Sequence, residues 1–152
     1  MTPKLGLPAP DFTLLDETST PHTLSQYRGK KIVLYFYPKD DTPGCTTEAC
    51  SFRDDYSAYT TSGAVILGVS PDSPKSHAKF KAKFHLPFTL LADEDHKIAE
   101  LYGVWGLKKF MGREYEGIHR TTFIISEDGK IQKIFEGVKP DGHSVEVLEA
   151  LK

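Results

Sequence analysis

Hydrophobic and polar residues follow one another along the chain in short blocks that predict strands and helices in turn. Six segments predict strands: Phe12–Leu15, Lys31–Tyr37, Ala64–Val69, Phe88–Leu91, Thr121–Ser126 and Lys130–Phe135. The second and third are nearly continuous apolar runs, which is typical of strands buried on both faces of a sheet. Between the last two segments, Glu127-Asp128-Gly129 is a turn sequence and predicts a hairpin.

Four helices are expected between and after these strands, over residues 43–62, 74–84, 95–102 and 142–151. The first has Thr42 as a capping residue, Pro43 at its first position and Gly63 as its stop. Its apolar face recurs at spacings of four, three, four and three through Cys45, Ala49, Phe52, Tyr56 and Tyr59. We therefore expect Cys45 to face the core from the first turn of this helix.

The second and fourth helices carry weaker patterns. Apolar residues alternate with lysines between Ala78 and Phe84, as in a strand, but the Ser73-Pro74 start and the Ala/Lys content favour a helix. In the C-terminal helix, Val145, Leu148 and Leu151 are expected on one side. The segment around Trp105 and Gly106 is interpreted as a loop.

This order of elements predicts an α/β architecture with helices on both faces of one sheet. The chain shows neither a repeat nor a linker, so residues 1–152 are expected to form a single domain. In such sheets, ligands bind beyond the carboxyl ends of the strands. The segment from Pro38 to Cys45 follows such an end and is the first place to look for a site.

Composition narrows the classes of function. The 152 residues include 19 Lys and Arg against 21 Asp and Glu, a net charge of −2, so we expect no nucleic acid partner. The longest apolar runs are far below the roughly 20 residues that a membrane span needs, and residues 1–11 lack a signal-peptide core. We expect a cytoplasmic protein whose two cysteines serve catalysis, redox sensing or metal binding rather than a permanent crosslink.

Cys45 has one feature of a reactive thiol. A cysteine reacts as the thiolate, which the positive end of a helix dipole favours. Asp40, Asp41 and Glu48 would oppose ionisation, so a nearby cation is expected, although spacing does not locate it. The alternative is that Cys45 is simply a small buried apolar residue.

Cys50 lies five residues after Cys45. In an intact helix this spacing separates the two Cα atoms by roughly 8 to 9 Å. A disulfide needs about 4.4 to 6.8 Å. Either the spacing is accidental, or the first turns of the helix unwind when the two thiols are oxidised.

Pro38, Thr42 and Cys45 match the Pro-x-x-x-Thr-x-x-Cys motif of the peroxiredoxins. With Cys50 five residues later, the chain resembles the bacterioferritin comigratory protein, or Q-type, subfamily. The resemblance extends from Pro8-Ala-Pro-Asp-Phe12 through Asp93 to Arg120-Thr-Thr-Phe123. It implies a thioredoxin-like fold with an N-terminal β extension and a central mixed sheet flanked by helices.

The resemblance also implies a role for each motif residue. Cys45 would be the peroxidatic cysteine, which attacks the peroxide and becomes a sulfenic acid, and Cys50 the resolving cysteine, which forms a disulfide with it. Thr42 would present its hydroxyl to the thiolate or the peroxide, and Pro38 would shield the pocket. Arg120 would supply the missing cation.

Backbone N–H groups of Gly44 and Cys45 would complete the anion site. The implied substrates are hydrogen peroxide and organic hydroperoxides, and the implied reductant is thioredoxin or a related dithiol protein. No cofactor and no metal is implied. Members of this subfamily are often monomers, so a monomer is expected here.

Other interpretations are weaker. A thioredoxin-like disulfide oxidoreductase would need a Cys-x-x-Cys motif and a proline in the approach to the late strand, at residues 117–121. A zinc site is disfavoured by the Cys-x-x-x-x-Cys spacing. A binding or chaperone-like module with two inert thiols stays open. His119 is expected at the surface, the lysines of residues 75–83 on a solvated face, and Trp105, Phe110 and Met111 in core or lid packing.

Overall fold

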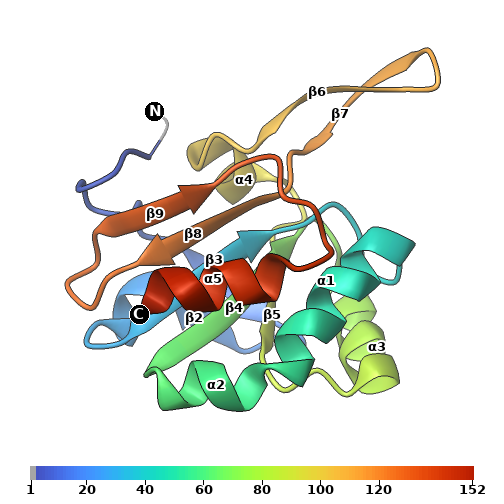
Figure 1. The fold of residues 1–152 in the computed structure, drawn as a ribbon. Helices are drawn as coiled ribbons and strands as arrows, with labels where there is room; N and C mark the ends of the chain where they lie inside the picture. The colour runs from blue at the N-terminus through green and yellow to red at the C-terminus, as the bar shows by residue number, and fades with distance from the viewer. Residues whose placement is uncertain (1–2) are drawn as a thin grey trace.

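A seven-stranded mixed sheet runs through the centre of the computed structural model, which describes residues 3–152 (Figure 1). The strands follow the order β2-β1-β5-β4-β3-β8-β9. Their bounds are β1 Thr13–Asp16, β2 Pro21–Thr23, β3 Lys31–Phe36, β4 Ala64–Ser70, β5 Thr89–Ala92, β8 Thr121–Ile125 and β9 Ile131–Phe135. All six expected strands are therefore confirmed, and β1 pairs with the unexpected β2 as an N-terminal hairpin.

Central strand β3 sets the position of the site. It pairs in parallel with β4 and antiparallel with β8, and its side chains are buried on both faces from Ile32 to Phe36. One face carries the core that includes Leu34, Phe36 and Phe123. The opposite face carries the core that includes Tyr35 and Phe52. The continuous apolar run of β3 thus reflects burial on both faces.

Helices cover both faces of the sheet (Figure 1). Their bounds are α1 Pro43–Asp54, α2 Tyr56–Thr61, α3 Pro74–Phe84, α4 Lys97–Leu101 and α5 His143–Leu151, with a short 3-10 helix at Leu24–Tyr27. Side chains of α1, α2, α3 and α5 enter the same core as Tyr35, whereas Ala99 of α4 enters the other. The start of α3 is as expected, since the Ser73 side chain accepts a hydrogen bond from the Ser76 N–H.

The expectation of one continuous helix over residues 43–62 is wrong. Asp55 has φ −98° and ψ 10° and separates α1 from α2. Its carboxylate accepts a hydrogen bond of 2.8 Å from the Ser144 hydroxyl of α5, which holds the chain at the break. The predicted apolar face is nevertheless the buried face of both helices, because Cys45, Phe52 and Tyr59 are all buried.

The orientation predicted for the C-terminal helix is also wrong in part. Val145 is 60% exposed, whereas Val147 and Leu151 are buried. Two polar residues of the first turn face inward and set this rotation. His143 makes a hydrogen bond of 2.7 Å with Thr122, and Ser144 accepts one of 2.8 Å at its carbonyl from Tyr59.

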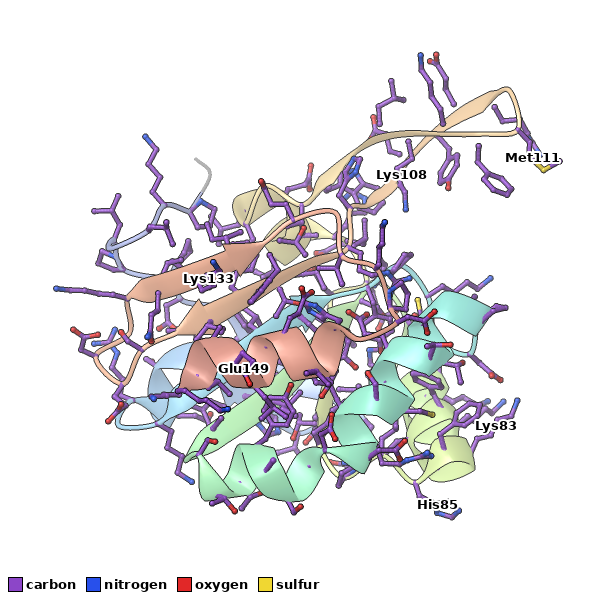
Figure 2. The ribbon with its side chains drawn as sticks, viewed as in Figure 1. Lys83, His85, Lys108, Met111, Lys133 and Glu149 are labelled. Atoms are coloured by element: carbon purple, nitrogen blue, oxygen red, sulfur yellow. The ribbon has the colours of Figure 1, made fainter. Side chains whose placement is uncertain are left out.

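The segment expected as a loop around Trp105 is a hairpin of β6 Trp105–Phe110 and β7 Arg113–Ile118. It projects away from the rest of the molecule, with Met111 at its tip (Figures 1 and 2). Phe110 and Met111 are 65% and 85% exposed, so the expectation of core or lid packing is wrong for both. Met111 and Gly112 have φ values of 50° and 78°, as a two-residue hairpin turn requires.

Met1 and Thr2 of the single domain expected over 1–152 lie outside the described residues. Within residues 3–152, none of the helices combines the length and the hydropathy that crossing a membrane demands.

Candidate active site

The candidate site lies where the chain leaves β3 and begins α1. Thr42 has an extended backbone, Pro43 occupies the first helical position, and the Thr46 N–H donates to the Thr42 carbonyl at 2.8 Å. Proline suits this position because its fixed φ fits the helix and a first-turn N–H has no helical acceptor. Cys45 therefore sits in the first turn, and it is only 2% exposed.

Arg120 approaches Cys45 from the neighbouring strand. It directly precedes β8, whose first residue, Thr121, pairs with Phe36 at the end of β3. The Arg120 Nη2 atom lies 3.3 Å from the Cys45 Sγ atom. The structure thus brings the cation expected from charge considerations to the thiol.

Gly44 makes room for this approach. A Cβ atom on Gly44 would lie 3.2 Å from the Arg120 Nη2 atom, closer than most side chains tolerate. The glycine before the cysteine therefore leaves space for the guanidinium over the helix start. The first-turn N–H groups of Gly44 and Cys45 face the same end of the helix, where no earlier carbonyl can accept from them.

Glu48 holds the other side of the same guanidinium. Its Oε1 atom accepts from the Arg120 Nη1 atom at 2.6 Å, and its side chain is fully buried. Instead of acting on Cys45 alone, as expected from the sequence, the carboxylate is paired with the arginine. In the sequence, Glu48 follows Cys45 by three residues, a spacing that places both on one face of a helix and so indicates that Glu48 lies near the thiol.

Burial and neighbouring charge shift the pKa values of Glu48 and Arg120 in opposite directions. Burial raises the pKa of Glu48 to about 7, although the charge and hydrogen bond of Arg120 work to lower it. Burial works to lower the pKa of Arg120, but the nearby Glu48 and Cys45 outweigh it and raise that pKa above its ordinary value. The guanidinium is thus permanently charged beside the sulfur.

Two buried polar atoms beside these groups lack partners among residues 3–152: the Tyr35 hydroxyl and the Glu48 Oε2 atom. Burial raises the pKa of Tyr35 well above its ordinary value, and negative charge on Glu48 and Cys45 adds to the rise. Tyr35 therefore stays protonated and neutral next to the site. Its place in a strand predicted to be buried is the one feature of the sequence that relates Tyr35 to this region.

Of the remaining expected residues, Thr42 caps the start of α1, Pro38 follows the end of β3, and Cys50 lies five residues after Cys45 on α1. The Thr42 hydroxyl donates to the Lys39 carbonyl at 2.8 Å, so its proton is not directed at Cys45. Pro38 is half-buried directly after Tyr37. Cys50 is half-buried on the intact helix α1, and both cysteines are free thiols. Burial raises the pKa of Cys50, although Arg53 works to lower it.

A pocket of about 380 Å³ lies on the hairpin side of Arg120. Its lining includes Tyr102, Lys108, His119, Arg120 and Phe123. Lys108 comes from β6 and donates to the Ile118 carbonyl at 2.8 Å. Burial and then the charge of Arg120 lower the pKa of Lys108. Because β6 was interpreted as a loop, Lys108 was not predicted as a residue of the site. His119 is exposed, as expected.

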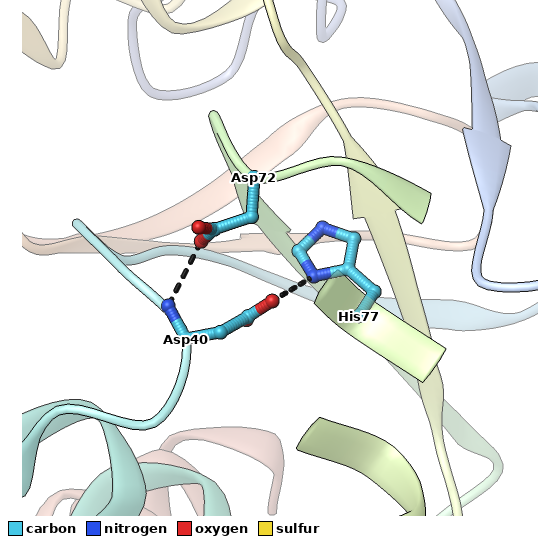
Figure 3. A group of neighbouring side chains, drawn as sticks. All are labelled: Asp40, Asp72 and His77. Atoms are coloured by element: carbon cyan, nitrogen blue, oxygen red, sulfur yellow. Dashed lines mark hydrogen bonds and ion pairs between the residues drawn. The ribbon is translucent and has the colours of Figure 1, made fainter. Parts of the chain in front are cut away.

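One group of side chains has the spacing of metal ligands. Asp40, Asp72 and His77 each offer an atom within 4.8 Å of the others (Figure 3). However, His77 Nδ1 lies 2.7 Å from an Asp40 oxygen and His77 Nε2 lies 2.9 Å from the Leu91 carbonyl. Both ring nitrogens are therefore occupied by hydrogen bonds, and neither offers a free lone pair to a metal ion.

Similarity to known proteins extends over the whole chain. Residues 5–134 match the AhpC/TSA family. The chain is 53% identical to the peroxiredoxin Bcp of Bacillus subtilis over 152 residues, covering 100% of this chain and 97% of the relative. It is 45% identical to the peroxiredoxin Bcp of Escherichia coli over 149 residues, covering 98% and 96% of the two chains.

Solved structures show the same fold. The bacterioferritin comigratory protein of Xanthomonas campestris, studied for its alkyl peroxide reduction activity, superimposes with a TM-score of 0.90 at 39% identity, covering 97% of each chain. A PrxQ mutant of Xylella fastidiosa superimposes with a TM-score of 0.93 at 36% identity, covering 99% of this chain and 96% of the other. The chain therefore belongs to the Bcp/PrxQ peroxiredoxins of the AhpC/TSA family and is a thiol peroxidase with a thioredoxin-like fold.

Proposed function

We propose that the chain reduces hydrogen peroxide and alkyl hydroperoxides through Cys45. The observation that carries this proposal is the Arg120 guanidinium, which contacts the sulfur of a cysteine buried in the first turn of a helix. Both the helix dipole and the permanent positive charge favour the thiolate over the thiol. The alkyl peroxide reduction activity of the Xanthomonas campestris relative supports the substrate class.

In the first step, the Cys45 thiolate attacks one oxygen of the peroxide and the O–O bond breaks. The sulfur is oxidised to a sulfenic acid, and the leaving oxygen takes up a proton and departs as water or an alcohol. Arg120 would hold the negative charge that moves from sulfur to oxygen. The N–H groups of Gly44 and Cys45 would donate to the same oxygen.

Thr42 and Pro38 would complete the pocket. Because the Thr42 hydroxyl gives its proton to the Lys39 carbonyl, we assign Thr42 the role of accepting a hydrogen bond from the peroxide. Pro38 has no N–H and its ring would keep water away from the sulfur.

In the second step, Cys50 would attack the Cys45 sulfenic acid, releasing water and forming a disulfide. Since α1 is continuous from Pro43 to Asp54, its first turns must unwind before the two sulfurs meet. Thioredoxin or a related dithiol protein would then supply two electrons and restore both thiols. We propose a monomer that works in the reducing cytoplasm, because one chain supplies every group of the site and both of its cysteines are free.

A coupled assay with thioredoxin, its reductase and NADPH tests this proposal. Hydrogen peroxide and tert-butyl hydroperoxide are offered to the native chain and to Cys45→Ser. We expect turnover of both peroxides by the native chain and none above background by the variant. Retained turnover in Cys45→Ser would refute the role of Cys45, and reduction of insulin disulfides without peroxide would favour the alternative of a protein disulfide oxidoreductase.

A further inference from the structure

A buried polar cluster lies behind the loop that leads into helix α1 (Figure 3). We call Asp40, Asp72 and His77, with Tyr37 and Ser76, the Asp40 cluster. The Asp40 carboxylate accepts three side-chain hydrogen bonds: 2.5 Å from Tyr37, 2.8 Å from Ser76 and 2.7 Å with His77. The Asp40 N–H donates to Asp72 at 2.8 Å. The chain is therefore fixed at Asp40, three residues before α1 begins.

His77 extends this attachment to the sheet. Its side chain is fully buried in α3, and its Nε2 atom donates to the Leu91 carbonyl of β5 at 2.9 Å. One proton is shared between the other ring nitrogen and the Asp40 carboxylate. The Asp40–His77 hydrogen bond thus joins the active-site loop to both α3 and β5.

The next residue has a conformation that needs such an attachment. Asp41 has φ 56°, in the left-handed region that costs free energy for residues other than glycine. Its own carboxylate pairs with the exposed Lys83 at 2.8 Å. An exposed pair of this kind adds little stability, so the buried contacts of Asp40 hold the loop in place.

Among residues 3–152, no hydrogen bond joins the Cys45 sulfur to the Asp40 cluster. The sulfur accepts one from Arg120, which comes from the start of β8. The Asp40 cluster therefore holds the loop that precedes Cys45, whereas Arg120 holds the Cys45 sulfur itself. Attack on peroxide and unwinding of α1 thus depend on different contacts.

We propose that the Asp40–His77 hydrogen bond controls the opening of α1, and with it whether the Cys45 sulfenic acid forms a disulfide or is oxidised further to sulfinic acid. The inference rests on the proposed function. In this proposal, opening of α1 moves Asp40 away from α3, which leaves buried hydrogen-bonding groups unpaired at a cost in free energy. Weakening the bond lowers this cost, so opening becomes more frequent and Cys50 reaches the sulfenic acid before a second peroxide does.

Asp40→Asn and His77→Gln test the inference in the full chain. Rapid mixing with hydrogen peroxide gives the rate of sulfenic acid formation and the rate of disulfide formation, and intact mass gives the sulfinic fraction at excess peroxide. We expect disulfide formation to rise about fivefold or more and the sulfinic fraction to fall accordingly. Sulfenic acid formation should stay within about threefold, because Arg120 and Cys45 are untouched.

Two exposed substitutions on α3 serve as matched controls. Lys83→Ala removes the pair with Asp41 on the same loop, and Lys81→Ala removes the pair with Glu17 elsewhere on the helix. Neither should change the rate of disulfide formation. Ser76→Ala deletes one hydrogen bond to Asp40 and should accelerate disulfide formation about twofold. This milder variant tests the inference if Asp40→Asn or His77→Gln folds poorly.

The outcomes separate the two proposals. If the native chain forms the Cys45–Cys50 disulfide but Asp40→Asn, His77→Gln and Ser76→Ala form it no faster, the inference is overturned while the proposed function stands. If loss of the cluster slows sulfenic acid formation more than it speeds disulfide formation, the cluster only shapes the pocket and the inference is likewise wrong. Absence of the disulfide from the native chain would overturn both.

Discussion

Arg120 connects two side chains of the site, since its two terminal nitrogens reach Glu48 and Cys45 at 2.6 and 3.3 Å. The planar guanidinium has donors in two directions, which a lysine ammonium on the same backbone could not hold in the same fixed geometry. Glu48 thus orients the arginine while the arginine favours the thiolate.

Arg120→Ala should slow the reaction of Cys45 with hydrogen peroxide by about 100-fold to 1,000-fold, the usual effect of removing one donor that stabilises developing charge. Arg120→Lys should recover only part of this rate. Stopped-flow kinetics on the two variants measure the effect. Lys109→Ala, which removes an exposed cation of the hairpin paired with Glu114, is the matched control and should react like the native chain. A rate within threefold of native in Arg120→Ala would contradict the account.

Glu48 should also give the stability a distinctive pH dependence. Its pKa is raised from an ordinary 4.5 to about 7 in the folded chain. Between these values the folded state keeps a proton that the unfolded state has lost, so the free energy of unfolding falls as pH rises. The fall from this group is about 3 kcal/mol and is complete above pH 7.

Urea unfolding of the native chain and Glu48→Gln at several pH values between 4 and 8 measures this contribution. The native free energy of unfolding minus that of the variant should decrease from pH 4.5 to 7 and then level off. A difference that stays constant over this range would mean that Arg120 keeps Glu48 ionised throughout.

At the residue scale, the sequence identifies Cys45 through its place in the first turn, and Arg120 only through the resemblance to a family. The contact between them spans 75 positions, and no local spacing encodes it. The Asp40 cluster illustrates the same limit, since His77 lies 37 positions from Asp40 and reaches it only because β3 and β4 are parallel neighbours. The pairing of Glu48 with Arg120 was missed for the same reason.

Helix α1 is the element on which the proposed mechanism depends, because in that proposal it is folded when peroxide reacts and unwinds for the disulfide to form. Its first turn carries Cys45, and Cys50 lies more than a turn later on the same helix. A short helix held mainly by side-chain packing suits this task, since isolated helices of its length are marginal in water.

Cys50→Ser should separate the two steps. The variant should react with the first equivalent of peroxide at the native rate and then stop as sulfenic acid, which excess peroxide converts to sulfinic acid. Intact mass spectrometry follows these species. Cys45→Ser, which should gain no oxygen at equal peroxide, is the control. Full turnover with thioredoxin in Cys50→Ser would instead show that the reductant attacks Cys45 directly.

The predicted strands and helices were located correctly, and each error in their bounds or orientation has an identifiable cause. The hairpin of β6 and β7 lacks alternation, and its turn is Met111-Gly112 rather than a frequent Asn-Gly or Asp-Gly pair. The break between α1 and α2 depends on Ser144, which is distant in sequence. Inward-facing polar residues turned α5 away from the side predicted by its apolar residues.

At the scale of the whole molecule, the sheet divides the core into two apolar layers, and the site is built on the layer that contains Phe52. Phe52 is fully buried and contacts the rings of Tyr35, Tyr59 and Phe88. It follows Cys45 by two helical turns, so the packing that stabilises the domain also holds the helix that carries the thiol.

Phe52→Ala should lower the free energy of unfolding by about 3 to 5 kcal/mol, because it leaves a cavity in this layer. Phe110→Ala, the same change on a side chain that is 65% exposed at the projecting hairpin, should alter it by less than about 0.5 kcal/mol. Urea unfolding at pH 7 compares the two variants. Equal losses would mean that the hairpin packs against the domain in solution.

In the proposed mechanism, Cys45 and Cys50 act as a peroxidatic and resolving pair, and the first turns of α1 open between the two steps. Its most direct test is an intact-mass spectrum recorded after one equivalent of hydrogen peroxide, with peptide mapping under non-reducing conditions. We expect the loss of two hydrogens, mapped to a Cys45–Cys50 disulfide, within seconds. An unchanged mass, with both thiols alkylated only after denaturation, would contradict it.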